Sequence, residues 1–316
     1  MSRAAPPRED DRARGAGSTT SSCPLTGRLG LWTATREARP RPRPERQPLV
    51  TPRHDCPFCD IAADDPRLLG VEVDGIGGRW FGLRNIYPPL EGPTGRAVLA
   101  VADGHSPTLA HRGSGLESAW AGMLALQVHL AGQLPARWSL LSTAVGVSAG
   151  ASQQHPHGQV LTPMDLPGAV VAMQRRLARE EVVDALLAEP RRVTSRDGLH
   201  LLAPPVPLGP ADLLVVPEIA GRIADLPVAA LAGLIASWLD RVHTLLEVAP
   251  APRAGPAPLD LKVLVHDALP GEPGRWIAEL QVTDRHAPGV AAAPLVDLVR
   301  PPDRHAAWFR SADRPA

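Results

Sequence analysis

The stretch GASQQHPHGQ, from Gly150 to Gln159, places two histidines on either side of one proline. A residue before proline favours extended geometry, and side chains of an extended chain alternate between two faces. His155, His157 and Gln159 are therefore predicted to project to the same side, with the proline holding the two imidazoles at a fixed relative angle. Ser152 and the amides around it form a candidate cradle for an anion. The two rings are candidate metal ligands, a candidate nucleophile, or members of an ordinary polar loop.

A second set of metal-ligand side chains lies upstream, in CPFC from Cys56 to Cys59. Two thiolates at this spacing can hold one zinc ion, and two neutral imidazoles would complete a tetrahedral site. The candidate imidazoles are those of His105, His111 and His155. A dithiol redox motif is the competing interpretation, but such a motif should follow a strand and open a helix. Because CPFC follows proline-rich sequence, a zinc site is favoured over a redox pair or two free cysteines.

From residue 95 onward the chain shows the same order of elements twice. In each half a strand and turn (95–110 and 211–227) precede an apolar helix, expected over Leu116–Leu134 and from Val228 onward, and two strands follow. Residues 166–189 are expected to form a helical bridge between the halves. This repeated order predicts an α+β fold of two tandem units with antiparallel sheets, each covered on one face by its helix.

The composition limits the kind of protein. The 316 residues are enough for two domains, and the 33 basic residues balance the 33 acidic ones, so no net charge attracts nucleic acid or anionic lipid. Three cysteines do not make a disulfide framework and fit a reducing compartment. No apolar run approaches the roughly 20 residues that span a bilayer, and the N-terminus lacks the hydrophobic stretch of a signal peptide. A cytoplasmic protein without nucleic-acid or membrane partners is predicted.

The N-terminal region is expected to lack a core of its own. Residues 1–21 have no apolar periodicity and are predicted to be a disordered tail. The arginines of RPRPRPERQPLVTPR, residues 39–53, could suggest nucleic-acid binding. No aromatic residues for base stacking are interleaved there, so a solvated connector is the favoured interpretation.

Five segments, taken in chain order, resemble one known family. They are PLTGRLGLWTATREARP (24–40) with two spaced arginines, Arg36 and Arg39; CPFC (56–59); RNIYPPL (84–90), in which Asn85 matches a nucleotide contact; GRAVLAVADGHSPTLA (95–110), which selects His105 over His111 as a zinc ligand; and GASQQHPHGQ (150–159). In this order they resemble the galactose-1-phosphate uridylyltransferase (GalT-like) branch of the histidine-triad superfamily. The resemblance covers most of the chain after residue 21.

The resemblance implies a nucleotidyltransferase with one structural zinc ion. Its ligands would be Cys56, Cys59, His105 and His155, in a closed site with no position open to water. His157 would attack the α-phosphorus of a nucleoside diphosphate sugar, release sugar 1-phosphate and carry the nucleotidyl group to a second phosphate acceptor. One ring nitrogen must then be unprotonated, while an acceptor, expected to be a backbone carbonyl of the His-Pro-His turn, holds the other N–H.

The resemblance also implies the remaining substrate contacts. Gln159 stands where hydrolytic members of the superfamily carry a third histidine, and it can donate a hydrogen bond to a phosphoryl oxygen without moving a proton. Ser152, Arg36 and Arg39 would stabilise charge on the phosphates, and Asn85 would contact the nucleotide. The expected ligands are a nucleotide sugar and either a sugar phosphate or phosphate, and a homodimer is a candidate assembly because the branch is commonly dimeric.

The resemblance further implies that the sheets of the two units are half-barrels, and it implies domain limits. It implies an N-terminal catalytic and zinc-binding unit over 22–165, a second unit over 166–300 and a terminal tail over 301–316.

The sequence departs from the branch in the second half and at the C-terminus. The position equivalent to His-Pro-His reads Glu279-Leu280-Gln281, and only His266 remains near the branch's second metal site, so no second metal is expected. Ala144 replaces an asparagine beside the active site, and residues 295–316 contain no recognisable hexose-contacting segment. Three functions therefore stay open. They are transfer to a sugar 1-phosphate, phosphorolysis with inorganic phosphate as in the ADP-glucose phosphorylases, and a non-catalytic zinc-stabilised nucleotide-binding protein.

Overall fold

The structure is a computed structural model of the 316-residue chain. The residues that it describes are 18–22, 29–33, 56–59, 61–75, 78–85, 95–105, 108–113, 115–133, 138–146, 149, 151, 153–163, 166, 168–188, 191–205, 207, 211–246, 259–282, 295–298 and 302–313.

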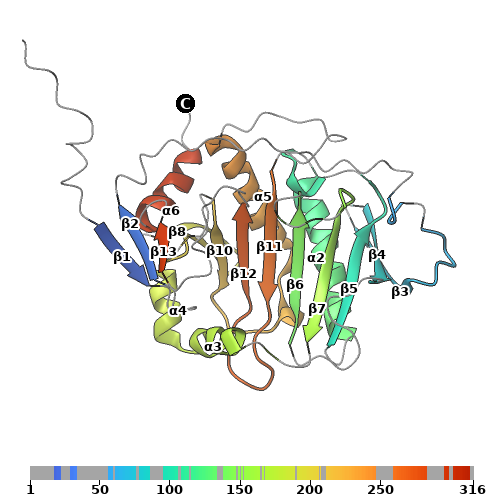
Figure 1. Cartoon of the computed structure of the whole chain (residues 1–316), viewed down its shortest axis with the longest axis horizontal. Coiled ribbons are helices and arrows are strands. Elements are labelled where there is room, and N and C mark those ends of the chain that lie inside the picture. Colours follow the sequence, from blue (N-terminus) through green and yellow to red (C-terminus); the bar gives the residue numbers. More distant parts are fainter. Residues whose placement is uncertain are drawn as a thin grey trace, which may run out of the picture.

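A single ten-stranded sheet forms the centre of the molecule, with every neighbouring pair of strands antiparallel (Figure 1). Its order is β3-β4-β5-β7-β6-β11-β12-β10-β9-β8. The strands of the first half are β3 (Leu68–Gly75), β4 (Gly78–Arg84), β5 (Gly95–Ala102), β6 (Leu140–Val145) and β7 (His157–Pro163). Those of the second half are β8 (Arg192–Arg196), β9 (Leu199–Leu202), β10 (Leu213–Pro217), β11 (Leu261–His266) and β12 (Ile277–Val282).

The two halves of the chain meet at the middle of this sheet. There β6 pairs with β11, in a register that runs from Val145 opposite Leu261 to Leu140 opposite His266. The predicted α+β class with antiparallel strands is confirmed. The expectation of separate half-barrel sheets is wrong, because the inner edges of the two sets of strands satisfy each other's backbone hydrogen bonds and leave one open sheet.

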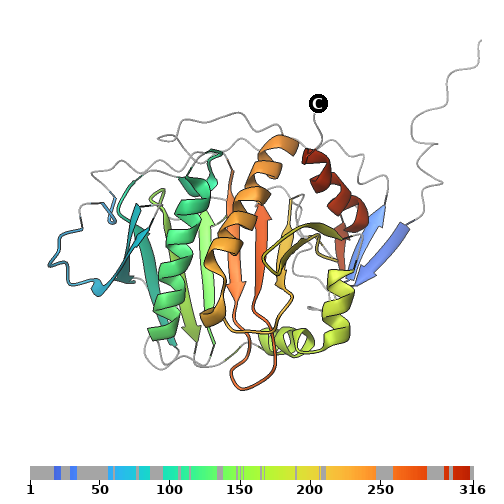
Figure 2. The ribbon, with the colours of Figure 1, turned by 180° about the vertical axis from the view of Figure 1, so that it is seen from behind.

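Two long helices cover one face of the sheet (Figure 2). They are α2 (Leu116–Gln133), packed on β3, β4, β5 and β7, and α5 (Val228–Leu245), packed on β8, β9 and β10. Both match the expected helices, and α5 begins directly after Pro227. Each helix buries a tryptophan whose indole N–H donates to a backbone carbonyl: Trp120 to Leu109 (3.1 Å) and Trp238 to Ala211 (2.9 Å). This satisfied burial anchors both helices to the core.

The bridge between the halves is helical, as expected, but it consists of two helices, α3 (Gly168–Leu177) and α4 (Glu180–Leu187). They pack on the opposite face of the second half. The apolar cluster there joins residues of α3 and α4 to alternate residues of the strands: Met173, Leu177, Val182, Leu186, Leu202, Leu214, Val216 and Ile277. The intervening positions, such as Leu213 and Val215, face α5 instead, since side chains of a strand alternate between its faces.

Several elements fall outside the expected pattern. The outer strands β3, β4, β8 and β9 were not predicted from the sequence. A separate three-stranded sheet joins β1 (Ser18–Ser22), β2 (Leu29–Thr33) and β13 (Leu295–Leu298), so part of the expected N-terminal tail is a strand. Short 3-10 helices occur at η5 (Thr108–Ala110), η6 (Ile223–Asp225) and η7 (Ser311–Asp313). Within the described part of the chain, no helix combines the length and hydropathy needed to cross a bilayer.

Most of the expected C-terminal tail is a helix, α6 (Pro302–Arg310). Ala306 and Phe309 are fully buried, and α6 contacts β8 and α5. The guanidinium of Arg241 donates to the Phe309 carbonyl at 3.0 Å. The spacing of these two apolar residues fits one face of a helix, which is why the segment docks on the body of the molecule.

Candidate active site

The sheet face opposite the long helices α2 and α5 carries the candidate site, on its central strands β7, β6 and β11 (Figure 1). This face is called the helix-free face because neither long helix covers it. On one side of this strip an apolar cluster covers β4 and β5, and on the other side α3 and α4 cover β10 and β12. The first cluster contains Phe58 and Ile61 from the segment around the CPFC motif, packed on Leu83, Leu99 and Val101. The central strip thus lies between two covered flanks.

The structure brings together Cys56, Cys59, His105 and His155, as predicted, whereas His111 lies outside this group. One potential ligand atom of each residue lies within 4.8 Å of those of the other three. The shortest separations are 3.1 Å between Cys59 Sγ and His105 Nδ1, and 3.5 Å between Cys56 Sγ and His155 Nδ1. A tetrahedral zinc with the usual bond lengths separates its sulfur and nitrogen ligands by about 3.6 Å. The donor set and its spacing therefore fit zinc.

The backbone of β5 sets the tautomer of His155. Its Nε2 lies 2.7 Å from the Ala102 carbonyl, which can only accept, so Nε2 carries the proton and the Nδ1 lone pair faces the thiols. Burial is the main cause that lowers the pKa of His155 to about 4, which keeps the ring neutral. The Ala102 amide also donates to the Pro156 carbonyl at 3.1 Å. Ala102 thus holds the His-Pro-His turn through two hydrogen bonds of its backbone. The sequence could not predict this contact, because a backbone carbonyl is common to all residue types.

His157 begins β7, and its ring has the hydrogen bond that the sequence analysis expected. Its Nδ1 lies 2.8 Å from the His155 carbonyl, so Nδ1–H donates and Nε2 keeps its lone pair. Burial lowers the pKa of His157 below its ordinary value, which favours the neutral ring. The Phe58 ring packs on His157 with centroids 5.2 Å apart and on His155 at 5.7 Å. The aromatic residue within CPFC thus contacts both imidazoles, a role the sequence analysis missed.

Gly158 leaves space for a side chain of α2 to contact the backbone of β7. A Cβ at this position would lie 2.4 Å from Gln127 Nε2 and 2.9 Å from Thr143 Oγ1. The fully buried Gln127 uses this space to donate to the Gln159 carbonyl at 3.2 Å. The backbone that carries His157 is therefore fixed by a polar contact through a gap that only glycine provides.

The structure describes only some of the other residues that were predicted to contact the substrate. Gln159 lies two residues beyond His157 on the same strand, and both are half-buried with Gly158 buried between them, so they share the helix-free face. His155 lies in the bend before the strand rather than within it. Asn85 follows β4 directly, two residues after Leu83, which pairs with Leu99 next to Gln159. Arg36, Arg39, Ser152 and Cys23 lie outside the described residues.

The second half carries different side chains on this face. Matched from the first residue of each strand, Ile277 of β12 takes the place of His157 in β7, and Glu279 that of Gln159. This shifts the correspondence expected from the sequence by four residues, since Gln281 was the expected counterpart of His157. Glu279 Oε2 accepts a hydrogen bond from Gln281 Nε2 (2.9 Å), and Glu279 Oε1 lies 3.0 Å from His266 Nε2. No imidazole occupies the position that corresponds to His157 in the described second half.

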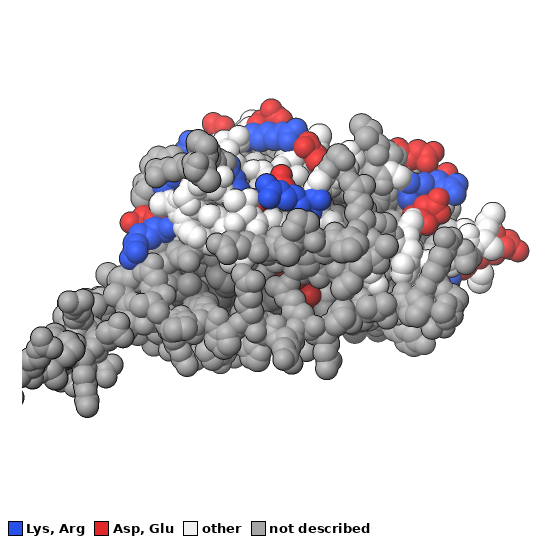
Figure 3. Space-filling model, turned by 90° about the horizontal axis from the view of Figure 1, so that it is seen from above, with Lys and Arg blue, Asp and Glu red and all other residues white. Residues whose placement is uncertain are grey.

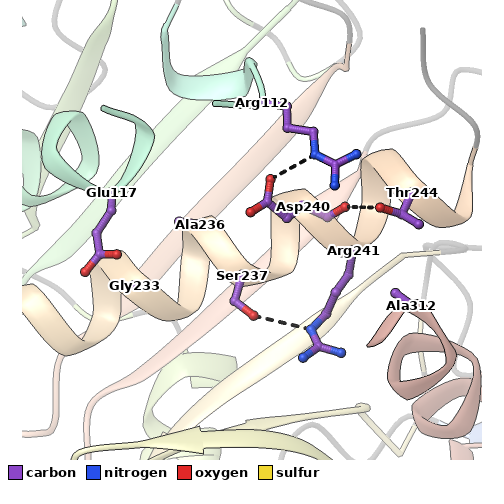
Figure 4. Close-up of a pocket in the computed structure, with 9 residues that line it drawn as sticks. All are labelled: Arg112, Glu117, Gly233, Ala236, Ser237, Asp240, Arg241, Thr244 and Ala312. Atoms are coloured by element: carbon purple, nitrogen blue, oxygen red, sulfur yellow. Dashed lines mark hydrogen bonds and ion pairs between the residues drawn. The ribbon is translucent and has the colours of Figure 1, made fainter. Parts of the chain in front are cut away.

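A polar cavity of about 400 Å³ lies on the helical face, away from these residues (Figure 4). Its charged groups have partners among the lining residues: Arg112 Nε lies 3.4 Å from Asp240 Oδ1, and Arg241 Nε donates to Ser237 Oγ at 3.3 Å.

On the face seen from above, basic and acidic side chains are intermixed where they are described (Figure 3). The described part of this face therefore has no extended patch of one charge sign, in keeping with the equal numbers of basic and acidic residues in the sequence.

Comparison with solved structures identifies the fold. An ADP-glucose phosphorylase from Arabidopsis thaliana, solved with bound ADP-glucose, aligns over 93% of this chain and 98% of its own, with a TM-score of 0.67 and 15% identity. A GalT-like protein from the same organism has the same coverage and identity with a TM-score of 0.63. A uridylyltransferase aligns over 93% of this chain and 98% of its own, with a TM-score of 0.60 and 18% identity. No protein-family model and no curated protein matches the sequence. The resemblance inferred from the motifs is confirmed at the level of the fold.

Proposed function

We propose that this chain is a nucleotidyltransferase that works by double displacement through His157. The Nε2 lone pair attacks the α-phosphorus of a nucleoside diphosphate sugar, a P–N bond forms, and the bond from that phosphorus to the bridging oxygen breaks. Sugar 1-phosphate leaves with the oxygen. In the second step a phosphate oxygen of the acceptor attacks the same phosphorus, and Nε2 recovers its lone pair. The leaving group is a stable anion in both directions, so the enzyme needs to stabilise charge rather than supply a proton.

The hydrogen bond from His157 Nδ1–H to the His155 carbonyl carries this proposal. It assigns the proton to one ring nitrogen and leaves the other as a nucleophile on the helix-free face. The lowered pKa of the ring supports the same state at neutral pH. Gln159, on the same face, would donate to a phosphoryl oxygen, and Asn85, Ser152, Arg36 and Arg39 would complete the contacts to the nucleotide and its phosphates.

We propose zinc as the resident metal, held by Cys56, Cys59, His105 and His155. Four ligands close the coordination sphere, so the ion would be structural and would fix the His-Pro-His turn. His155 belongs to the metal group while its carbonyl accepts from His157. Metal binding would therefore fix the orientation of the nucleophile.

We also propose that the two halves are tandem units of one fold, with limits at 22–165 and 166–300. From the outer edge inward, the first half runs β3-β4-β5-β7-β6 and the second β8-β9-β10-β12-β11. In both, three strands precede the long helix and two follow it. This repeated order supports duplication, with the second unit contributing shape and no nucleophile.

The acceptor separates two candidate reactions. A sugar 1-phosphate makes the chain a hexose-1-phosphate nucleotidyltransferase, and inorganic phosphate makes it a nucleotide-sugar phosphorylase. Residues 295–316 contain no recognisable hexose-contacting segment, and this favours inorganic phosphate as the second candidate acceptor. ADP-glucose and UDP-glucose are the first donors to test, since the structural neighbours include an ADP-glucose phosphorylase and a uridylyltransferase.

The test is intact-mass analysis after incubation with each nucleotide sugar. The wild type should gain one nucleotidyl group and should exchange labelled sugar 1-phosphate into the nucleotide sugar without a second acceptor. His157→Ala should lose both, while binding the nucleotide sugar. His157→Gly should accept a preformed nucleotidyl imidazolide, because the missing ring leaves a cavity of its own shape. His129→Ala, which removes an exposed imidazole on α2, is the matched control and should behave as the wild type.

Absence of exchange for every nucleotide sugar tried, or near-normal turnover by His157→Ala, would reject double displacement. A non-catalytic nucleotide-binding protein would then be the better account of the His-Pro-His turn.

A further inference from the structure

Lys262 is the only lysine in the sequence, so the other 32 of the 33 basic residues are arginines. The two cations differ chemically. Arginine presents a flat fork of donors, whereas lysine presents a compact point charge with three donors that can rotate, and it is a common ligand of phosphate. All the remaining basic positions carry arginine, so Lys262 is the one position in the sequence with a side-chain ammonium.

That place is the helix-free face, two strands from the nucleophile. In the sheet, Ser142 of β6 lies opposite Gln159 on one side and opposite Leu264 on the other. Two residues further along the same face, Ala144 lies opposite Lys262. Continuing the register of β6 and β7 from Ser142 and Gln159 by two residues sets Ala144 between Lys262 and His157. Neighbouring strands are about 4.8 Å apart, so the backbones of His157 and Lys262 are separated by about 10 Å. The side chain between them is a single methyl group.

Lys262 as a whole residue is half-buried, and no described residue forms a hydrogen bond or an ion pair with its ammonium group. Carboxylates lie nearby on the sheet, but they have other partners. Both oxygens of Glu279 are engaged, by His266 and by Gln281, although Gln281 is the residue directly opposite Lys262. The carboxylate of Asp260 lies against Gly146, where a Cβ would come within 1.8 Å of its oxygen. A cation on a half-buried residue, with no counter-charge among the described residues, favours an anionic ligand.

We propose that Lys262 binds the phosphate that leaves in the first step and attacks in the second. This inference rests on the proposed function and names a part of its substrate site. An in-line displacement places the attacking imidazole and the departing phosphate on opposite sides of the α-phosphorus. A nucleotide diphosphate lying across β6 would thus have its α-phosphate at His157 on β7 and its leaving phosphate at Lys262 on β11. The ligand class is a phosphate monoester or inorganic phosphate.

Labelling of the wild-type chain tests this without relying on turnover. Reductive methylation with formaldehyde and cyanoborohydride modifies amines, and peptide mass spectrometry separates Lys262 from the N-terminal amine. Inorganic phosphate and glucose 1-phosphate should each slow the methylation of Lys262 several-fold, relative to chloride at equal ionic strength. The phosphate that protects at the lower concentration identifies the preferred acceptor. Equal methylation rates with and without both phosphates would overturn the proposal.

A kinetic test isolates the step in which the phosphate attacks. Adenosine or uridine 5′-phosphoroimidazolide loads the nucleotidyl group onto His157 with neutral imidazole as the leaving group. Lys262→Met should therefore load as the wild type does. Its discharge by subsaturating phosphate or glucose 1-phosphate should be at least tenfold slower, because the cation that binds the acceptor is missing. Arg175→Met is the matched control, since it removes an exposed cation from α3, and it should discharge at the wild-type rate.

The two proposals fail in different ways. If the wild type cannot be loaded at all, double displacement through His157 is wrong. If the wild type loads and discharges but Lys262→Met discharges at the same rate, the proposed function stands and the role of Lys262 is wrong.

Discussion

Replacing Gly158 by alanine should destabilise the protein and displace its nucleophile, although the change adds a single methyl group. The new Cβ would lie 2.4 Å from Gln127 Nε2 and 2.9 Å from Thr143 Oγ1, well inside contact distance. Gln127 is only 1% exposed, so it has no room to turn toward solvent. Either Gln127 gives up its hydrogen bond to the Gln159 carbonyl, or β7 moves away from α2.

The two costs can be estimated separately. Forcing a methyl group into a packed interior costs about 1–3 kcal/mol, and loss of the hydrogen bond costs about 0.5–1.5 kcal/mol. The free energy of unfolding should therefore fall by about 2–4 kcal/mol, a drop in Tm on the order of 10 °C. A shift of β7 by a fraction of an ångström would also misplace His157, and the rate of nucleotidyl transfer should fall by up to about 100-fold.

Denaturant unfolding and the nucleotidyl-loading assay should be run on a double-mutant cycle. Gln127→Ala removes the atom that meets the new methyl group. The double variant Gly158→Ala with Gln127→Ala should therefore be more stable than the sum of the single changes predicts, by at least about 1 kcal/mol. Gly132→Ala is the control, because a Cβ at Gly132 on α2 meets nothing within 4 Å. It should leave stability unchanged or raise it by up to about 1 kcal/mol.

Two results would refute this reasoning. One is a Gly158→Ala variant as stable as the wild type. The other is strict additivity in the cycle, which would mean that Gln127 and the added methyl group do not meet.

Further changes test the metal site and the second half. Cys59→Ala should lose zinc and thermal stability together, since metal affinity is coupled to folding. Metal analysis checks this, with Cys23→Ala as a control that should keep the metal. A Cys59→Ala chain with one zinc per molecule would contradict the assignment. Glu279→Gln should keep more than about a tenth of the activity, because the proposed chemistry lies in the first half and each tenfold step corresponds to about 1.4 kcal/mol. A loss of several powers of ten would reveal a second chemical site. Phe58→Leu should keep the metal but reduce transfer several-fold, since it removes the ring that packs on His157.

Local patterns in the sequence determined the parts of the molecule that depend on near neighbours. Pro227 and the apolar spacing after it predicted α5, and the alternating segments predicted the central strands. The group of potential metal ligands could also be predicted, because thiols and imidazoles at such spacings are rare and each carries its own chemistry. The expected hydrogen bond from His157 to a carbonyl of its own turn follows from contacts only two residues apart.

Tertiary structure decided the features that depend on remote backbone. The pairing of β6 with β11 merges two expected sheets into one, and it sets Lys262 in line with His157 across Ala144. Gln127 behind Gly158 and the Ala102 carbonyl behind His155 come from elements 31 and 53 residues away in the chain. The physical reason is the same in each case. Backbone carbonyls, strand registers and van der Waals gaps are common to all residue types, so only the folded chain shows which of them meet.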